Sequence, residues 1–224
     1  MTAKARTGSA TAVVLEVGQK KVFASALDWP GWSRSGKTEE EALAALAEYA
    51  ARYAVVAKRA RIAFPAKVAE SFDVVERQRG NATTDFGAPA VIAKAERQPT
   101  TAAAGQRLAA LMTGAWAVFD EVASAAPAQL RKGPRGGGRD RDKMIAHVLD
   151  AEAAYARKLG IKEQPPAIDD PAAIEVLREA IAAVIAARSD GTAFVDKGWP
   201  VRYAARRITW HVLDHAWEMQ DRAS

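Results

Sequence analysis

The second half of the chain, from about Thr100 to the C-terminus, repeats apolar residues at helical spacing in four long stretches. Residues rich in Pro and Gly separate them, and the predicted helices are 102–125, 140–159, 171–188 and 200–221. Each helix must bury its apolar face, and the connections are only a dozen or so residues long. This part of the chain is therefore predicted to form an all-α four-helix bundle.

The first part of the chain carries shorter and more varied patterns. Two β-rich runs, Val13–Val17 and Val22–Leu27, flank a Gly-Gln-Lys-Lys turn and predict a hairpin. Thr38 with Glu41 three residues later forms a capping box, which predicts a helix that ends near Arg59.

A further strand is predicted within residues 68–77, and turn residues are dense from Gly80 to Pro89. We read the dense turns as a domain boundary. The predicted organisation is a small α+β module over residues 1–85, followed by the bundle over residues 86–224. The chain is predicted to be mainly α overall.

The absence of cysteine excludes disulfides, thiolate metal sites and cysteine nucleophiles. Any metal must therefore bind through His, Asp or Glu. The longest uninterrupted apolar run, Ala180–Ala187, is far shorter than the roughly 20 residues of a membrane-spanning helix. Residues 1–14 lack the apolar segment of a secretory signal. These features predict a cytoplasmic protein with no membrane partner.

A basic, glycine-rich loop accounts for part of the net charge of +5; its basic side chains are Arg131, Lys132, Arg135, Arg139, Arg141 and Lys143. Because a helix N-terminus favours anions, Arg135, Arg139 and Arg141 are candidates to bind a carboxylate or phosphate of a cosubstrate. The alternative is a solvated linker. The loop has no interleaved aromatic residues, so nucleic-acid binding is disfavoured.

Three further arginines lie in the last predicted helix: Arg202, Arg206 and Arg207. They are predicted to be surface charges, with the alternative that one of them faces a pocket of the bundle.

All three histidines lie in or directly beside two copies of the tetrapeptide His-Val-Leu-Asp: His147 in one copy, His211 and His215 at the other. On the predicted helices each imidazole falls on the apolar face and points inward. A buried imidazole without a partner costs about 1 to 3 kcal/mol. One divalent metal ion would satisfy all three, and three protein ligands leave a position open for water or substrate.

The carboxylates near these histidines have several possible roles. Val212 stands where the H-E-x-x-H motif has its glutamate, which disfavours a protease of that type. Glu218 is a candidate fourth ligand, hydrogen-bond partner of a ligand, or catalytic base, and Asp150 is a candidate partner of His147. The alternative is that the histidines are structural and bond to Tyr155, Asp150 or backbone carbonyls.

The second half of the chain, about Thr100 to Ser224, resembles the DinB/YfiT-like superfamily. The resemblance rests on His147 in the segment MIAHVLDAE and on H-x-x-x-H at His211 and His215. It implies a four-helix bundle of up-down-down-up topology that holds zinc, nickel or another divalent ion on these histidines. It also implies a transferase or isomerase that uses a small thiol such as mycothiol or bacillithiol.

Residues 12–58 resemble the HicB-type antitoxin fold, through the hairpin, the WPGW turn and the T-x-E-E-A start of a helix at Thr38. No separate DNA-binding motif of that family is present in the sequence. The resemblance implies an accessory module, and its exposed strand edges predict a homodimer.

Three functions follow as hypotheses. The first is a metal-dependent enzyme, a thiol-dependent S-transferase or isomerase, acting on a small electrophilic molecule. The second is a noncatalytic binding or regulatory protein with an HicB-like interaction module and a structural or absent metal. The third is a metal-dependent hydrolase with Glu218 as base.

Overall fold

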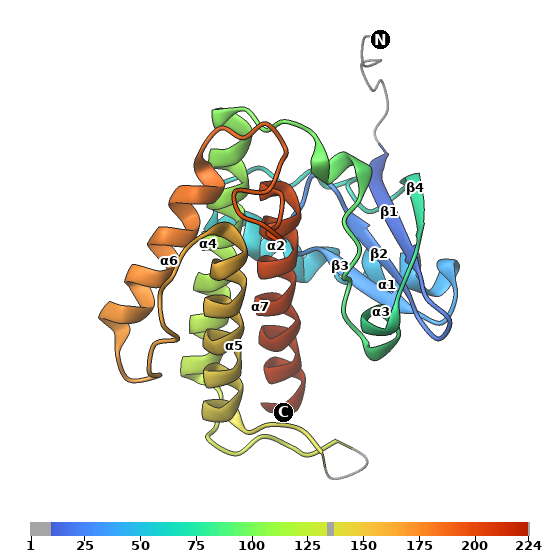
Figure 1. The fold of residues 1–224 in the computed structure, drawn as a ribbon. Helices are drawn as coiled ribbons and strands as arrows, with labels where there is room; N and C mark the ends of the chain where they lie inside the picture. Colours follow the sequence, from blue (N-terminus) through green and yellow to red (C-terminus); the bar gives the residue numbers. More distant parts are fainter. Residues whose placement is uncertain (1–9, 134–136, 224) are drawn as a thin grey trace. The chain divides into compact units, whose positions relative to one another are not determined.

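The computed structural model describes residues 10–133 and 137–223. Figure 1 shows the chain, which separates into two compact units. Within the described residues the first unit comprises residues 10–28, 32–54 and 63–91, and the second comprises 29–31, 55–62 and the described residues from 92 onward. Both units are therefore assembled from segments that alternate along the chain.

The first unit contains a sheet with strand order β3-β2-β1-β4. The predicted hairpin is confirmed, because β1 (Thr11–Val17) and β2 (Val22–Ala26) pair antiparallel with Val17 opposite Val22. The predicted third strand is also confirmed as β4 (Phe72–Arg79), which lies parallel to β1 at the sheet edge. The short polar strand β3 (Ser33–Gly36) escaped prediction because it has no apolar alternation.

The predicted capping box is confirmed, since Thr38 caps α1 (Glu39–Glu48) by accepting a hydrogen bond from the Glu41 N–H at 3.2 Å. The single helix expected up to Arg59 is divided at Tyr49, so α2 (Ala50–Arg59) is a separate helix. Trp32 is fully buried, stacks on Tyr53 with ring centroids 5.7 Å apart, and donates from Nε1 to the Leu46 carbonyl at 2.8 Å. Trp32 thus packs against α1 and the start of α2 within the first unit.

Two short elements follow the sheet: α3 (Ala82–Phe86) and the 3-10 helix η1 (Lys94–Arg97). Neither was predicted, because each is shorter than the period needed to show an apolar stripe. Buried Glu16 on β1 accepts hydrogen bonds from the Thr84 hydroxyl and from the N–H groups of Ala90 and Val91. The Glu16 carboxylate therefore has a structural role within the first unit.

The second unit is built around α4 (Ala102–Ala125), α5 (Arg141–Ala156), α6 (Pro171–Ala186) and α7 (Val201–Ala223), with the 3-10 helix η2 (Arg157–Leu159) after α5. These helices match the four predicted stretches to within two residues at most ends. In Figure 1 α5 and α7 run side by side, and α4 packs against both α6 and α7. The buried side chains include Leu111, Phe119, Met144, Ile181 and Trp217.

The predicted fold class, an α+β module followed by a four-helix bundle of up-down-down-up topology, is wrong. The second unit is not made by four helices alone, because residues 55–62 of the α2 region and the turn at 29–31 belong to it. Gly114 of α4 lies so close to this region that a Cβ there would be 2.7 Å from the Val56 carbonyl oxygen. Helical periodicity reveals that a helix has a buried face, but it does not reveal which elements cover that face.

Helix α4 is the one described helix that is long and apolar enough, by length and composition, to cross a membrane. However, 56% of its most apolar window is buried inside the protein. A buried core helix has the same apolar composition as a membrane-spanning one, so composition alone does not distinguish them.

Candidate metal centre

The structure brings the three histidines together. Their candidate ligand atoms all lie within 4.8 Å of one another, and Nε2 of His211 is 3.3 Å from Nε2 of His147. The ring centroids are 4.7 to 5.1 Å apart. Among the described residues, these are the His, Asp or Glu side chains grouped closely enough to hold a metal ion.

Local helical geometry explains this convergence. His211 and His215 lie on successive turns of α7, four residues apart, so that their side chains share one face. Val212 is fully buried beside them, and Met144 and Val148 are fully buried on either side of His147 on α5. Packing of these apolar side chains therefore holds the imidazoles between the two helices.

The surroundings keep two of the imidazoles neutral. Burial lowers the pKa of His211 well below its ordinary value, and the neighbouring His215 and His147 lower it further. Burial also lowers the pKa of His147, with Arg139 as the next cause. A neutral imidazole keeps the lone pair that a metal ion needs.

The protein does not satisfy the buried His211 ring by itself. Its side chain is 7% exposed, and Nδ1 has no hydrogen-bond partner within the described residues. His147 is partly exposed, whereas the side chain of His215 is only 12% exposed.

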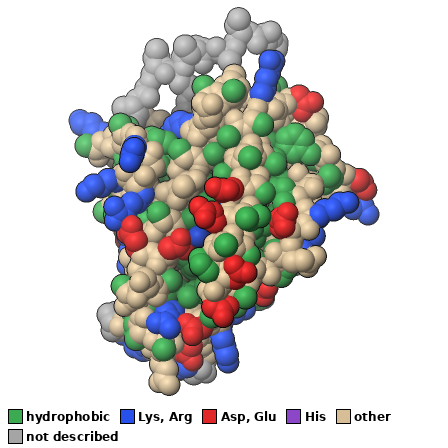
Figure 2. Space-filling model, turned by 90° about the vertical axis from the view of Figure 1, so that its left-hand side faces the viewer, with side chains coloured by type: hydrophobic (Ala, Val, Ile, Leu, Met, Phe, Trp, Pro, Cys, Tyr) green, Lys and Arg blue, Asp and Glu red, His purple; other side chains and the backbone are tan. Residues whose placement is uncertain are grey.

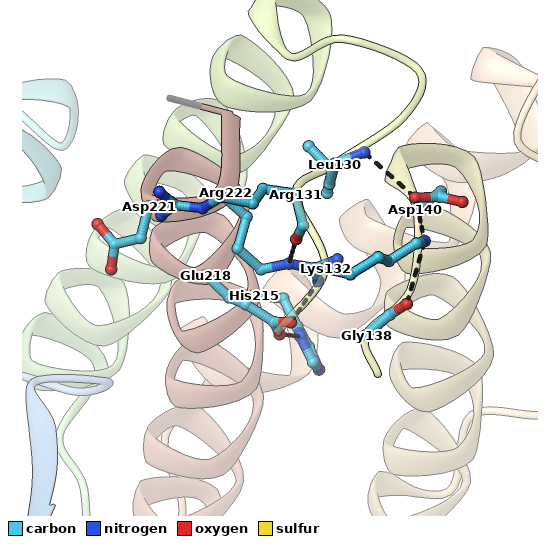
Figure 3. Close-up of polar contacts among 9 residues, drawn as sticks. All are labelled: Leu130, Arg131, Lys132, Gly138, Asp140, His215, Glu218, Asp221 and Arg222. Atoms are coloured by element: carbon cyan, nitrogen blue, oxygen red, sulfur yellow. Dashed lines mark hydrogen bonds and ion pairs between the residues drawn. The ribbon is translucent and has the colours of Figure 1, made fainter. Parts of the chain in front are cut away.

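Glu218 lies beside the cluster and makes two strong contacts. Its Oε2 is 3.1 Å from Nδ1 of His215, and its Oε1 accepts a hydrogen bond from Nη1 of Arg222 at 2.7 Å (Figure 3). The hydrogen bond with His215 lowers the pKa of Glu218, and Arg222 adds to this effect. The carboxylate fixes the proton on Nδ1, which leaves the lone pair on Nε2 of His215 for a ligand.

The start of the basic loop is tied to the end of α7. Arg222 donates from Nε to the Arg131 carbonyl at 2.8 Å, and the Arg131 N–H donates to the Arg222 carbonyl at 2.9 Å (Figure 3). Near α5, Lys132 Nζ lies 2.5 Å from Oδ1 of Asp140, which also accepts from the Leu130 N–H. This segment thus connects the ends of the two helices that carry the histidines.

Two of the three arginines predicted to bind an anion lie within the described residues. Arg135 lies outside the described residues. Arg139 is exposed, and its charge lowers the pKa of His147 and His211. Arg141 is engaged elsewhere, because its guanidinium donates to the Ala126 carbonyl at 3.1 Å and to Asp142 at 2.7 Å.

Asp150 was a candidate hydrogen-bond partner of His147. It is exposed on α5, and its effect on His147 is electrostatic, raising the pKa against the larger effect of burial.

Aromatic residues form one wall of the centre. The ring of Tyr155 meets His211 edge-on with centroids 5.7 Å apart, and Trp199 packs on Tyr155 at 5.1 Å. Arg207 lies over Tyr155 and over Trp210 at 5.5 and 4.8 Å from the ring centroids. The sequence already indicated that Arg207 shares the helical face of the histidines, since it precedes His211 by four residues.

Arg206 corrects the prediction that the arginines of this helix are surface charges. It is 6% exposed and pairs with buried Glu96 of η1, with Nε 2.5 Å from Oε1. Nothing in the helical period distinguishes this internal ion pair from a solvated charge, because the partner lies 110 residues away.

A second buried polar cluster, also missed from the sequence, surrounds Glu152 of α5. The carboxylate is 1% exposed, accepts from Nε1 of Trp116 at 2.7 Å, and pairs with Nε of Arg178 at 3.2 Å. Arg178 also pairs with Asp120 at 2.8 Å. Burial raises the pKa of Glu152 despite these partners.

This second cluster adjoins a groove of about 620 Å³ lined by residues of α4 and α6, among them Trp116, Asp120, Ile174 and Arg178. Figure 2 views the molecule from the side on which α6 lies and shows acidic side chains among apolar ones there. The groove is thus distinct from the histidine centre.

Comparison of the chain with protein-family models, with curated proteins and with solved structures found no match. The resemblances to the DinB/YfiT-like superfamily and to the HicB-type fold stay predictions. Support for a metal centre comes from the geometry of the three histidines.

Proposed function

We propose that this chain is a divalent-metal-dependent enzyme whose ion is held by His147, His211 and His215. The observation that carries the proposal is the convergence of three inward imidazoles with candidate ligand atoms within 4.8 Å. No fourth protein ligand is part of the group among the described residues, which leaves room for a substrate or water.

The spacing of the nitrogens fits a metal ion. Two nitrogens that each lie about 2.0 to 2.1 Å from a tetrahedral ion are roughly 3.3 to 3.4 Å apart. The Nε2 atoms of His147 and His211 are separated by 3.3 Å. A direct hydrogen bond between the rings has a similar length, but it assigns no role to the approach of His215, whose ring centroid lies 4.7 Å from that of His211.

The donor set suits zinc or nickel, because imidazole is a good ligand for both. When bound, such an ion supplies a Lewis acid that lowers the pKa of a coordinated water or thiol. Glu218 orients His215 through Nδ1, and the aromatic wall of Tyr155 and Trp199 shields one side of the centre from water.

The resemblance to the DinB/YfiT-like superfamily suggests transfer or isomerisation with a small thiol such as mycothiol, acting on an electrophilic small molecule. Because the chain has no cysteine, the thiol must be a cosubstrate. The lack of cysteine also suits the reducing cytoplasm, where we place the protein. We propose further that the first unit forms a homodimer through the open edge of β4.

A hydrolase with Glu218 as base receives less support. Both oxygens of Glu218 are engaged, one with His215 and one with Arg222, and its lowered pKa makes it a weak base. In assays with enough zinc to keep the weaker site of a Glu218 variant loaded, thiol-dependent transfer that survives Glu218→Ala is expected under our proposal. Activity without a thiol that disappears in Glu218→Ala would instead establish the hydrolase.

Elemental mass spectrometry of protein purified without an affinity tag tests the metal centre. We expect near-stoichiometric zinc or nickel in the wild type and its loss in His147→Ala and His211→Ala. Asp150→Ala, an exposed change on the same helix as His147, is the matched control and should keep the metal. A wild-type protein that stays empty after incubation with zinc or nickel would overturn the proposal and favour the noncatalytic binding protein.

A further inference from the structure

Arg207 continues the line of metal-ligand candidates along α7. Arg207, His211 and His215 follow one another at intervals of four residues, which places them on one helical face. The charge of Arg207 is among the causes that lower the pKa of His211, so the guanidinium lies within electrostatic reach of that ring. The arginine is thus a neighbour of the proposed metal centre.

The guanidinium of Arg207 contacts aromatic rings instead of carboxylates. It lies over the rings of Trp210 and Tyr155, and its Nη1 is buried with no hydrogen-bond partner among the described residues. Two other arginines of the same unit have carboxylate partners, since Arg206 pairs with Glu96 and Arg178 pairs with Asp120 and Glu152. Arg202 also has a buried nitrogen, Nε, without a partner among the described residues, but its guanidinium donates to the Pro99 carbonyl at 3.3 Å. Arg207 therefore has a charge that the described residues leave without a counter-ion.

This arrangement has the properties of an anion-binding group. A buried charged donor without an acceptor is unfavourable, and an oxyanion can remove that penalty with charge-assisted hydrogen bonds. The two rings hold the planar guanidinium in place, which reduces the entropy lost when a ligand binds. Because Tyr155 also meets the His211 ring, an anion bound to Arg207 would lie beside the metal centre.

We propose that Arg207 binds a carboxylate group of the substrate, so that the enzyme acts on small organic acids whose reactive atom is placed at the three histidines. This inference rests on the metal centre proposed above. It adds a substrate class and a residue that selects it, and it does not depend on which reaction follows.

Isothermal titration of the zinc-loaded full-length protein with hydroxamates tests the proposal. Acetohydroxamate is uncharged and binds zinc alone, whereas the monohydroxamates of malonic, succinic and glutaric acid add a carboxylate at three distances. We expect at least one of these acids to bind the wild type about ten- to a hundredfold more tightly than acetohydroxamate does. In Arg207→Gln this gain should disappear while acetohydroxamate still binds.

Two further variants control the experiment. Arg157→Gln removes an equal charge from an exposed position on η2 and should keep the full gain. Arg207→Lys keeps the charge but loses the planar fork, so an intermediate gain is expected. Arg207→Lys also provides a folded variant if Arg207→Gln destabilises the helix.

The outcomes separate the two proposals. If acetohydroxamate binds but no carboxylate increases the affinity, or if the gain persists in Arg207→Gln, the role of Arg207 is overturned and the metal centre stands. If the protein takes up no zinc and no hydroxamate binds, the metal centre is overturned and the substrate proposal with it.

Discussion

Helix α5 contributes to two buried polar clusters that differ in how their hydrogen bonds are satisfied. Around Glu152, the carboxylate accepts from Trp116 and Arg178, and Arg178 also reaches Asp120. Around His147, five residues earlier, the neighbours are two more imidazoles, and Nδ1 of His211 has no partner among the described residues. The first cluster is complete within the protein, whereas the second contains a buried nitrogen that has no partner among the described residues.

We interpret this difference as one between a polar cluster that stabilises the fold and a polar cluster that is available to a ligand. A buried ion pair contributes little net stability compared with apolar side chains, but removal of one partner leaves an unpaired buried charge. The converging imidazoles have no such internal compensation among the described residues, and the metal ion proposed above would join them through their ring nitrogens. The burial of a polar side chain and the number of its hydrogen-bond partners thus indicate its role better than its residue type does.

The largest effect is expected when the complete cluster is broken. Glu152→Ala should lower the free energy of unfolding by about 3 to 5 kcal/mol, because Arg178 and the Trp116 N–H lose a buried acceptor. Urea unfolding followed by circular dichroism measures this. Glu152→Gln should cost less, since its amide oxygen can still accept from Trp116. A loss below about 1 kcal/mol in Glu152→Ala would show that the cluster is not needed for stability.

Zinc should raise the free energy of unfolding through the histidine cluster, and the Glu152 cluster should not affect this gain. With free zinc at a hundred times its dissociation constant, the wild type should gain about 2.7 kcal/mol in free energy of unfolding. Glu152→Gln should gain a similar amount, and His211→Ala should gain none. Urea titrations with zinc and with a chelator measure the difference. Equal gains in wild type and His211→Ala would place the bound zinc elsewhere.

Glu218 should affect metal affinity more than folding. Glu218→Gln keeps an acceptor for His215 but removes the negative charge, so the dissociation constant for zinc should rise about 10- to 100-fold. Competition with a chromophoric chelator measures it. An unchanged affinity would mean that the hydrogen bond to His215 does not tune the centre.

The two clusters should respond to pH with opposite signs in the metal-free protein. His147 and His211 have lowered pKa values, so the unfolded chain binds more protons and the free energy of unfolding should fall as pH drops below about 6.5. Glu152 has a raised pKa, so its contribution should be present at low pH and decline as pH rises above about 4.5. These are the smallest effects expected here.

Urea unfolding of the metal-free protein between about pH 4 and pH 8 measures both pH dependences of the free energy of unfolding. His211→Leu should flatten the dependence near pH 6.5, and Glu152→Gln should change it only at the acidic end. A steeper dependence near pH 6.5 in His211→Leu would contradict the neutral state assigned to that imidazole.

Local elements and the histidine faces were predictable from the sequence. The Thr38 cap, the hairpin and the four long helices all follow from interactions within a few residues, and the i,i+4 spacing placed His211 and His215 on one face. The break at Tyr49 and the polar strand β3 were missed because neighbouring elements decide them. The sequence also contained no signal that residues 29–31 and 55–62 cluster with the second unit.

The sequence by itself determined where helices and strands lie and which side chains of each helix point inward, because backbone geometry repeats over a few residues. Only the tertiary structure decided which inward side chains meet. It paired Glu152 with Arg178, gave Arg206 its partner Glu96, and left His211 and Arg207 beside each other with unmet hydrogen bonds. Such pairings depend on the packing of segments far apart in the chain, and no local period encodes that packing.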